Sequence, residues 1–192
     1  YFYEIEKHKN LIYENFNSNH LIVFGINTLD KKSGKFFNSF VIIDHNFKKK
    51  FQYDKIKLVP FGEFLPFQSK LENIGFKKVT EGFGSFSKGG MHNAFSYNNL
   101  NIIPLICYEI IFTKLTQKIN FNYNLIINIS EDGWFGQSIG PKQHFAHSIF
   151  RAIESGKYVL RSANNGIAAI INPLGEIQES IKFGQSGYAD LK

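Results

Sequence analysis

This sequence has no pair of cysteines, no long apolar run and few arginines, and each absence argues against a class of protein. A single cysteine cannot form an internal disulfide, which fits a reducing compartment or an enzyme that keeps one thiol free. No run of residues approaches the ~18 consecutive apolar positions that a membrane helix needs, because the most apolar stretch, residues 102–112, is interrupted by Pro104 and Glu109. Arginine occurs only at positions 151 and 161, and neither a zinc-ligand spacing nor an RNA-binding motif is present, so nucleic acid is not an expected partner.

What is present favours one globular domain. The chain has 192 residues, of which 43% are hydrophobic and 16% aromatic, enough for a large core in a single domain covering residues 1–192. The formal net charge of +6 permits anionic partners. Most lysines are scattered apart from residues 48–50 and 77–78. We therefore expect mainly solvated charges, with phospholipid headgroups as the favoured anionic partner.

The hydrophobic pattern alternates between the periods of strands and helices. Helices are predicted at residues 2–17, 109–119 and 141–156, the last with a proline in its first turn and a glycine at its end. Apolar, β-branched runs predict strands at residues 21–29, 36–44, 101–106, 124–130, 158–163 and 166–173. The first two runs are separated by DKKSGK and should pair as a hairpin, whereas residues 54–101 read as long functional loops. Together the elements indicate an α/β or α+β layered fold with both faces of its sheet covered.

Cys107 stands at the junction of a predicted strand and a predicted helix. A buried strand ends at Ile106, the thiol follows, and the helix begins at once, which exposes a nucleophile near the positive end of a helix. The alternative is that a lone cysteine is buried as a small apolar side chain.

Two polar segments are further candidates for a site. Lys55 and Glu63 lie in KIKLVPFGEFLPF, where two prolines stiffen the backbone, although a solvated surface loop would also explain them. Trp134 and Phe135 follow the strand at 124–130 in a glycine-punctuated loop, and they could line an apolar pocket or merely cap the core. Residues 164–166, Asn-Asn-Gly, alone indicate only a turn.

In their order and spacing these segments resemble the nitrilase superfamily, and more closely its apolipoprotein N-acyltransferase branch. The matching strings are KLVPFGEFLPF, ICYEIIF, ISEDGWFGQSIGPKQH, RAIESGKYVLRSANNGI and PLGEI, which together run from about residue 53 to residue 177. The resemblance implies an α/β fold of the nitrilase type, a four-layer α-β-β-α sandwich with mixed sheets.

The resemblance also implies roles for particular residues. It assigns the lysine of a Glu-Lys-Cys triad to Lys55, the nucleophile to Cys107, and a further glutamate beside the triad to Glu63. Tyr108 and Glu109 match the two positions after the nucleophile, and with Trp134 and Phe135 they are expected to bind substrate. The general-base glutamate matches nothing in YFYEIEKHKN and is expected upstream of Tyr1. In ISEDGW, Glu131 replaces the usual asparagine.

The activity implied by the resemblance is the transfer of a phospholipid acyl chain. The chain would pass through a cysteine thioester to the N-terminal amine of a diacylglyceryl-cysteine lipoprotein, without metal or organic cofactor. The intact protein would be a bacterial inner-membrane enzyme with this domain on the periplasmic side, joined to membrane helices outside this sequence. A soluble C–N hydrolase, in which water resolves the thioester, is the main alternative, and a non-catalytic binding module on the same fold is the third.

Overall fold

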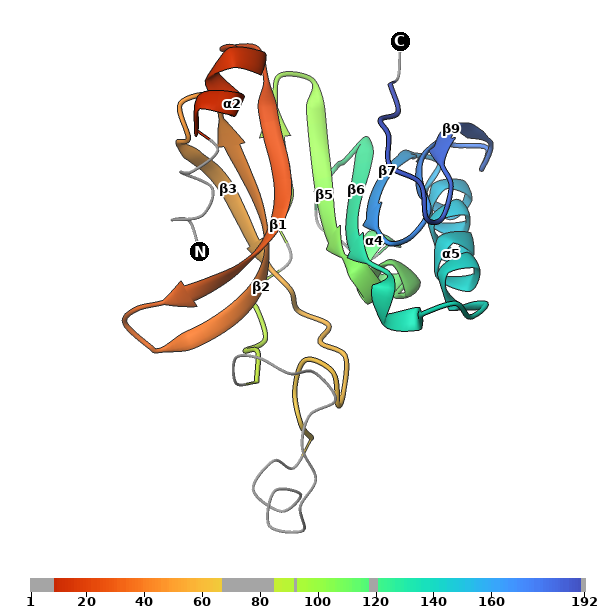
Figure 1. Ribbon diagram of the computed structural model, residues 1–192, viewed down its shortest axis with the longest axis horizontal. Coiled ribbons are helices and arrows are strands. Elements are labelled where there is room, and N and C mark those ends of the chain that lie inside the picture. Colours follow the sequence, from red (N-terminus) through yellow and green to blue (C-terminus); the bar gives the residue numbers. More distant parts are fainter. Residues whose placement is uncertain (1–8, 67–84, 92, 118–120, 191–192) are drawn as a thin grey trace. The chain divides into compact units, whose positions relative to one another are not determined.

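The computed structural model describes residues 9–66, 85–91, 93–117 and 121–190. The chain forms two compact units, Tyr1–Met91 and His92–Lys192 (Figure 1). The predicted single domain stays a prediction. Within the described part of the chain, no helix is long and apolar enough to cross a membrane.

The first unit is built on a three-stranded antiparallel sheet. Helix α2 (Lys9–Asn15) precedes β1 (Leu21–Asp30), β2 (Lys35–Asp44) and β3 (Lys49–Asp54), and the sheet order is β1-β2-β3. The β1–β2 pairing confirms the predicted hairpin. Of the helix predicted at 2–17, residues 2–8 lie outside the described residues. The centre of the sheet carries the core, because four consecutive residues of β2, Phe40–Ile43, are fully buried.

The second unit contains a six-stranded mixed sheet. Its strands are β4 (Phe95–Tyr97), β5 (Leu100–Ile106), β6 (Leu125–Glu131), β7 (Tyr158–Asn164), β8 (Ala168–Ile171) and β9 (Ile177–Ile181), in sequence order across the sheet. β5, β6 and β7 are parallel, and the outer pairings are antiparallel. The three parallel strands coincide with the runs predicted at 101–106, 124–130 and 158–163. Most of their buried residues are apolar, as expected for covered parallel strands, and the exceptions are Asn128 in β6 and Arg161 in β7.

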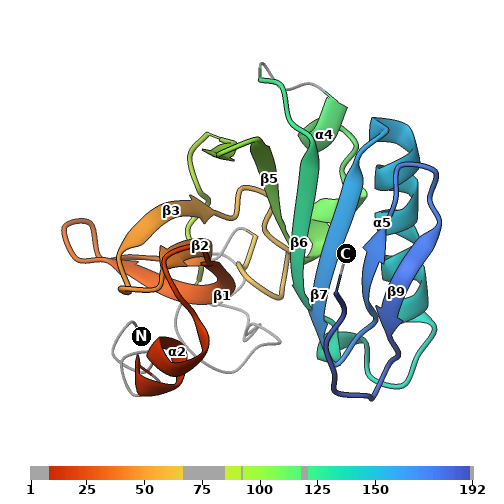
Figure 2. The same cartoon turned by 90° about the horizontal axis from the view of Figure 1, so that it is seen from above.

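A long helix packs on this sheet. Helix α5 (Gly140–Ser155) has Pro141 in its first turn and ends at Gly156, whose φ of 63° lies in the left-handed region that glycine adopts without strain. It contacts β7 and β8 and lies along one face of the sheet, as Figure 2 shows. The helix predicted at 141–156 is therefore confirmed.

The helix predicted at 109–119 is wrong in its described part. That part holds a short 3₁₀ helix, η1 (Cys107–Ile111), and one turn of α-helix, α4 (Lys114–Gln117). Phe112 between them is extended, with φ −89° and ψ 98°. The β-branched residues Ile110, Ile111 and Thr113 disfavour a continuous helix there. Residues 118–119 lie outside the described residues. So do residues 67–84 of the loop region predicted at 54–101, which include the lysines at 77–78.

Candidate active site

Cys107 occupies a sharp turn at the end of β5. It follows Ile106 directly, begins η1, and has a φ of 51°. The left-handed region costs a residue with a Cβ about 1–2 kcal/mol, so surrounding contacts must stabilise this backbone. The thiol is free and the residue partly exposed. Because β5, β6 and β7 are parallel and in register, their carboxyl ends bring Cys107 to the same edge of the sheet as the residues that follow β6 and β7.

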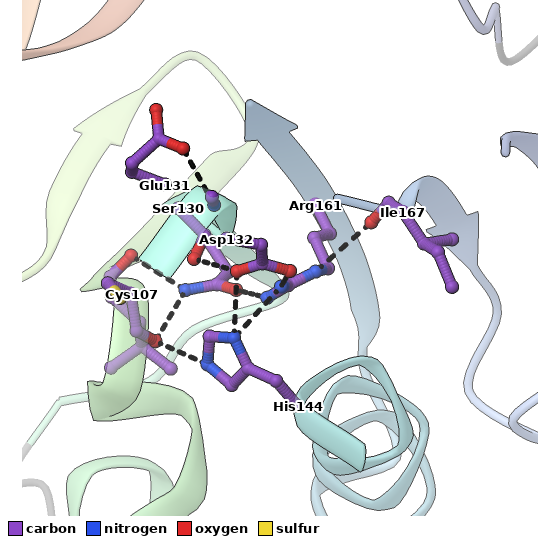
Figure 3. Close-up of polar contacts among 10 residues, drawn as sticks. Cys107, Ser130, Glu131, Asp132, His144, Arg161 and Ile167 are labelled. Carbon is purple, nitrogen blue, oxygen red and sulfur yellow. Dashed lines mark hydrogen bonds and ion pairs between the residues drawn. The ribbon is translucent and has the colours of Figure 1, made fainter. Parts of the chain in front are cut away.

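The carbonyl group of Cys107 is held by two side chains from other elements. His144 of α5 directs its Nε2 at this oxygen at 3.2 Å, and the Nδ2 of Asn128 in β6 donates to it at 3.4 Å. Asn128 also donates to the carbonyl of Leu105 at 3.1 Å. Figure 3 shows His144 reaching from α5 toward both Cys107 and Asp132.

Behind His144 lies a buried ionic cluster. The Oδ1 of Asp132 is 2.9 Å from the Nδ1 of His144, and its Oδ2 accepts a hydrogen bond from the Nη2 of Arg161 at 2.7 Å. Arg161 also donates through Nη1 to Asn128 and through Nε to the carbonyl of Ile167. Burial raises the pKa of Asp132, but the hydrogen bond with His144 and the charge of Arg161 outweigh it, so this pKa lies below its ordinary value.

Four side chains of this cluster were not predicted from the sequence as site residues: Asn128, Asp132, His144 and Arg161. The signals that could have found them were an asparagine inside the otherwise apolar strand NLIINIS and an arginine, one of only two in the chain, inside another strand. A polar group in a buried strand requires partners, and here those partners lie up to 33 residues away.

Tyr108 and Glu109 follow the thiol but differ in their surroundings. Tyr108 is 38% exposed, and its ring lies 5.9 Å from that of Phe112 and 6.3 Å from that of His144. Glu109 is fully buried, and its Oε2 accepts the N–H of Ile106 at 2.9 Å, which braces the end of β5. Their predicted contacts with substrate stay predictions.

The loop after β6 carries the two predicted aromatic residues. Trp134 and Phe135 belong to the 3₁₀ helix η2 (Gly133–Phe135), where Trp134 is 58% exposed and the Phe135 ring lies 5.5 Å from that of His144. Glu131 fastens this loop. Its carboxylate accepts the N–H of Gly133 at 2.8 Å and the side-chain amides of Asn164 and Asn165 at the end of β7. Glu131 therefore has a structural role in holding this loop against the end of β7.

Lys55 and Glu63 form a separate buried pair in the first unit. The Lys55 Nζ lies 2.8 Å from the Glu63 Oε2, and the two residues are 1% and 8% exposed. Glu63 also accepts from the Nδ2 of Asn38 at 2.8 Å and from the N–H of Val59 at 2.9 Å. A solvated surface loop does not explain such contacts. Lys55 thus contacts Glu63 within the first unit, and Cys107 lies beside the loop after β6 within the second.

Comparison with known proteins defines the class of this chain. A family model described as carbon-nitrogen hydrolase matches residues 13–190, so the chain belongs to the carbon-nitrogen hydrolase family. No group of three or more His, Cys, Asp or Glu side chains that could hold a metal ion occurs among the residues that the structure describes.

Within this family the chain is similar to proteins named apolipoprotein N-acyltransferase. It is 43% identical to the one from Bradyrhizobium diazoefficiens over 155 residues, which cover 80% of this chain and 29% of that protein. It is 41% identical to the one from Rickettsia typhi over 172 residues, which cover 88% of this chain and 34% of the relative. The chain therefore spans about a third of the length of these relatives. The predicted resemblance is confirmed.

Solved structures support the predicted fold. A Saccharomyces cerevisiae member of the nitrilase superfamily matches with a TM-score of 0.66 at 18% identity, covering 95% of this chain and 62% of that one. Glutamine-dependent NAD+ synthetase from Acinetobacter baumannii matches with a TM-score of 0.69 at 16% identity, covering 95% of this chain and 32% of that one. At such identities the likeness concerns the fold alone, and it confirms the nitrilase-type α/β class with its mixed sheet.

Proposed function

We propose that this chain is the catalytic part of an apolipoprotein N-acyltransferase of the bacterial inner membrane, acting on the periplasmic side. The enzyme would take an acyl chain from a phospholipid and transfer it to the N-terminal amine of a diacylglyceryl-cysteine lipoprotein. Similarity to proteins of that name over 80–88% of the chain supports the substrate class. The observation that carries the chemistry is the position of Cys107, partly exposed in a left-handed turn at the end of a parallel strand.

In the first half-reaction the Sγ of Cys107 attacks the ester carbonyl carbon of the phospholipid. A glutamate base takes the thiol proton, and the oxyanion is stabilised by the Lys55 ammonium and the N–H of Tyr108. The ester C–O bond then breaks, the lysophospholipid leaves with that proton, and the acyl group remains on sulfur as a thioester.

In the second half-reaction the lipoprotein amine attacks the thioester carbonyl. The C–S bond breaks, an amide forms, and the thiol regains a proton. A thioester suits this order because it resists water longer than it resists a well-placed amine. The competing hydrolase would discharge the same thioester to water. The amidases among the solved structures are 12% identical to this chain and inform only the fold.

The test is to trap the intermediate. Full-length protein in detergent is incubated with a phospholipid that carries a fluorescent acyl chain. We expect an acyl group on Cys107 that hydroxylamine removes, and no such adduct in Cys107→Ala. The adduct should be discharged by a diacylglyceryl-cysteine peptide much faster than by buffer. Acylation that persists in Cys107→Ala would exclude this nucleophile, and equal discharge by buffer and peptide would favour the hydrolase.

A further inference from the structure

The carbonyl of Cys107 and the N–H of Tyr108 belong to one peptide group. A trans peptide is planar, and its C=O and N–H bonds point in opposite directions. Any contact that fixes the Cys107 oxygen therefore also fixes the direction of the Tyr108 N–H. Two side-chain donors hold that oxygen, the Nε2 of His144 at 3.2 Å and the Nδ2 of Asn128 at 3.4 Å.

His144 is held firmly in this position. It is 4% exposed, and its Nε2 faces a carbonyl, which can only accept, so Nε2 carries a proton. Its Nδ1 lies 2.9 Å from the Asp132 carboxylate and 3.2 Å from the Nη2 of Arg161, so this nitrogen has a partner whether or not it is protonated. Asp132 is fully buried and also accepts the hydroxyl of Ser130 at 2.7 Å. A chain of buried polar groups thus ends on the Cys107 oxygen (Figure 3).

We propose that His144, supported by Asp132, is a positioning residue that aims and polarises the Cys107–Tyr108 peptide. A hydrogen bond donated to a peptide oxygen strengthens the N–H of the same group as a donor, by roughly 10–30% per bond. It also offsets the strain of the left-handed backbone at Cys107. This inference rests on the proposed function, because the Tyr108 N–H matters only if an oxyanion forms beside it.

If His144 only fills the core, its replacement by glutamine or by asparagine should affect acylation to a similar extent. If it acts by donating a hydrogen bond from Nε2, the two replacements should differ. The amide nitrogen of glutamine lies close to where Nε2 lies in histidine, and that of asparagine lies close to Nδ1. His144→Gln therefore keeps a donor toward the Cys107 oxygen, whereas His144→Asn keeps one toward Asp132. The nearby His147, partly exposed on the same helix with its ring against Phe150, is the control position.

The experiment compares two reactions of the same thiol in full-length protein. Acylation by a fluorescent phospholipid passes through an oxyanion, whereas alkylation by iodoacetamide does not. Loss of one oxyanion donor costs ~10²–10³ in rate, and a misaimed donor should cost ~10–100-fold. We expect acylation to fall by that amount in His144→Ala and His144→Asn and to recover most of the loss in His144→Gln. Alkylation should change little in all three variants, and His147→Ala should behave as wild type in both reactions.

Each other outcome has a definite meaning. Unchanged acylation in His144→Ala overturns the inference, as does rescue by asparagine rather than glutamine. If alkylation falls in parallel with acylation in the asparagine variant, His144 supports the thiol rather than the peptide, and the inference is again wrong. If His144→Ala does not fold, the acylation rates of His144→Gln and His144→Asn still test the inference. If the wild-type protein is alkylated but never acylated, the proposed function itself has failed.

Discussion

A buried ion pair such as Lys55–Glu63 leaves an uncompensated charge when one partner is removed. In Lys55→Met the Glu63 carboxylate keeps two hydrogen-bond donors but loses its counter-charge. Breaking such a pair costs about 3–5 kcal/mol of unfolding free energy. Loss of an electrostatic donor to the oxyanion costs a further ~10²–10³ in acylation rate. We therefore expect both stability and activity to fall, as measured by urea unfolding and phospholipid acylation.

A double variant separates the two effects. Lys55→Met combined with Glu63→Gln buries no charge and should regain most of the lost stability while activity stays low. Lys57→Met, at an exposed position two residues on, should change neither quantity by much. If the double variant regained wild-type acylation, Lys55 would be a structural residue and the proposed role in oxyanion stabilisation would be wrong.

The candidate residues differ in how visible they are in the sequence. Lys55, Glu63 and Cys107 stand in local motifs, so a single segment of sequence is enough to notice each one. Asn128, Asp132 and Arg161 become significant only when β6 and β7 lie side by side, because Arg161 bonds to partners 33 and 29 residues away. Hydrophobic periodicity predicts the strands but does not pair polar groups within them.

Among the structural elements, the end of β3 depends on close contact between two backbone segments. The N–H of Gly89 donates to the carbonyl of Lys55 at 2.9 Å, and a Cβ added at Gly89 would overlap the carbonyl group of Asp54. Gly89→Ala should therefore push the chain away at Asp54 and shift Lys55 with it. We expect a lower melting temperature and slower acylation. Gly90→Ala is the matched control, since a Cβ there meets nothing within 4 Å.

The contrast between these neighbours is the informative measurement. Both substitutions remove one glycine from the unfolded chain, so their effects on chain entropy are nearly equal. A difference between them reports on the folded state alone. If Gly89→Ala matched Gly90→Ala in melting temperature and acylation rate, the close approach of residues 54 and 89 would not support the position of Lys55.

The elements that were predicted well have strong local signals. The hairpin of β1 and β2 has two apolar runs around a glycine turn, and α5 has its proline and glycine at the expected ends. β3 was not predicted, because it begins within three lysines and lies at the edge of its sheet, where polar residues are tolerated. Helix 109–119 was wrongly predicted because its apolar residues fit a helical period while β-branched side chains favoured a break at Phe112.

On the scale of the whole molecule, the family match at residues 13–190 spans both compact units. The proposed chemistry likewise draws on residues from each unit, with the cation at Lys55 and the thiol at Cys107. The buried His144–Asp132–Arg161 cluster lies entirely in the second unit. Part of the response of the protein to acid should therefore originate there, beside the contributions of Asp30 and Asp44 in the first unit, whose pKa values are also lowered.

Two groups of the second unit make stability depend on pH in separate windows. Burial lowers the pKa of His147, and the charges of Arg151 and His144 lower it further, while Glu154 opposes them. The folded state thus disfavours a charged His147 side chain, and the resulting stabilisation is present above the ordinary pKa of ~6.5 and is lost as pH falls through the lower folded-state value. The pKa of Asp132 is also lowered, so its stabilisation is complete above ~3.9 and disappears only at more acidic pH.

We therefore expect the melting temperature of the intact protein to fall in two stages as the pH is lowered at constant salt. His147→Gln should flatten the first stage, which begins below about pH 6.5, and should leave the second unchanged. Asp132→Asn should melt lower than wild type at neutral pH, because the buried Arg161 loses its counter-charge. Its deficit relative to wild type should then start to shrink below about pH 4, where the Asp132 carboxyl of the unfolded wild-type chain takes up a proton, and should disappear as pH falls through the lower folded-state pKa. A deficit that stayed constant down to the acid limit of folding would mean that folding does not lower the pKa of Asp132. The ionic support assigned to it behind His144 would then be wrong.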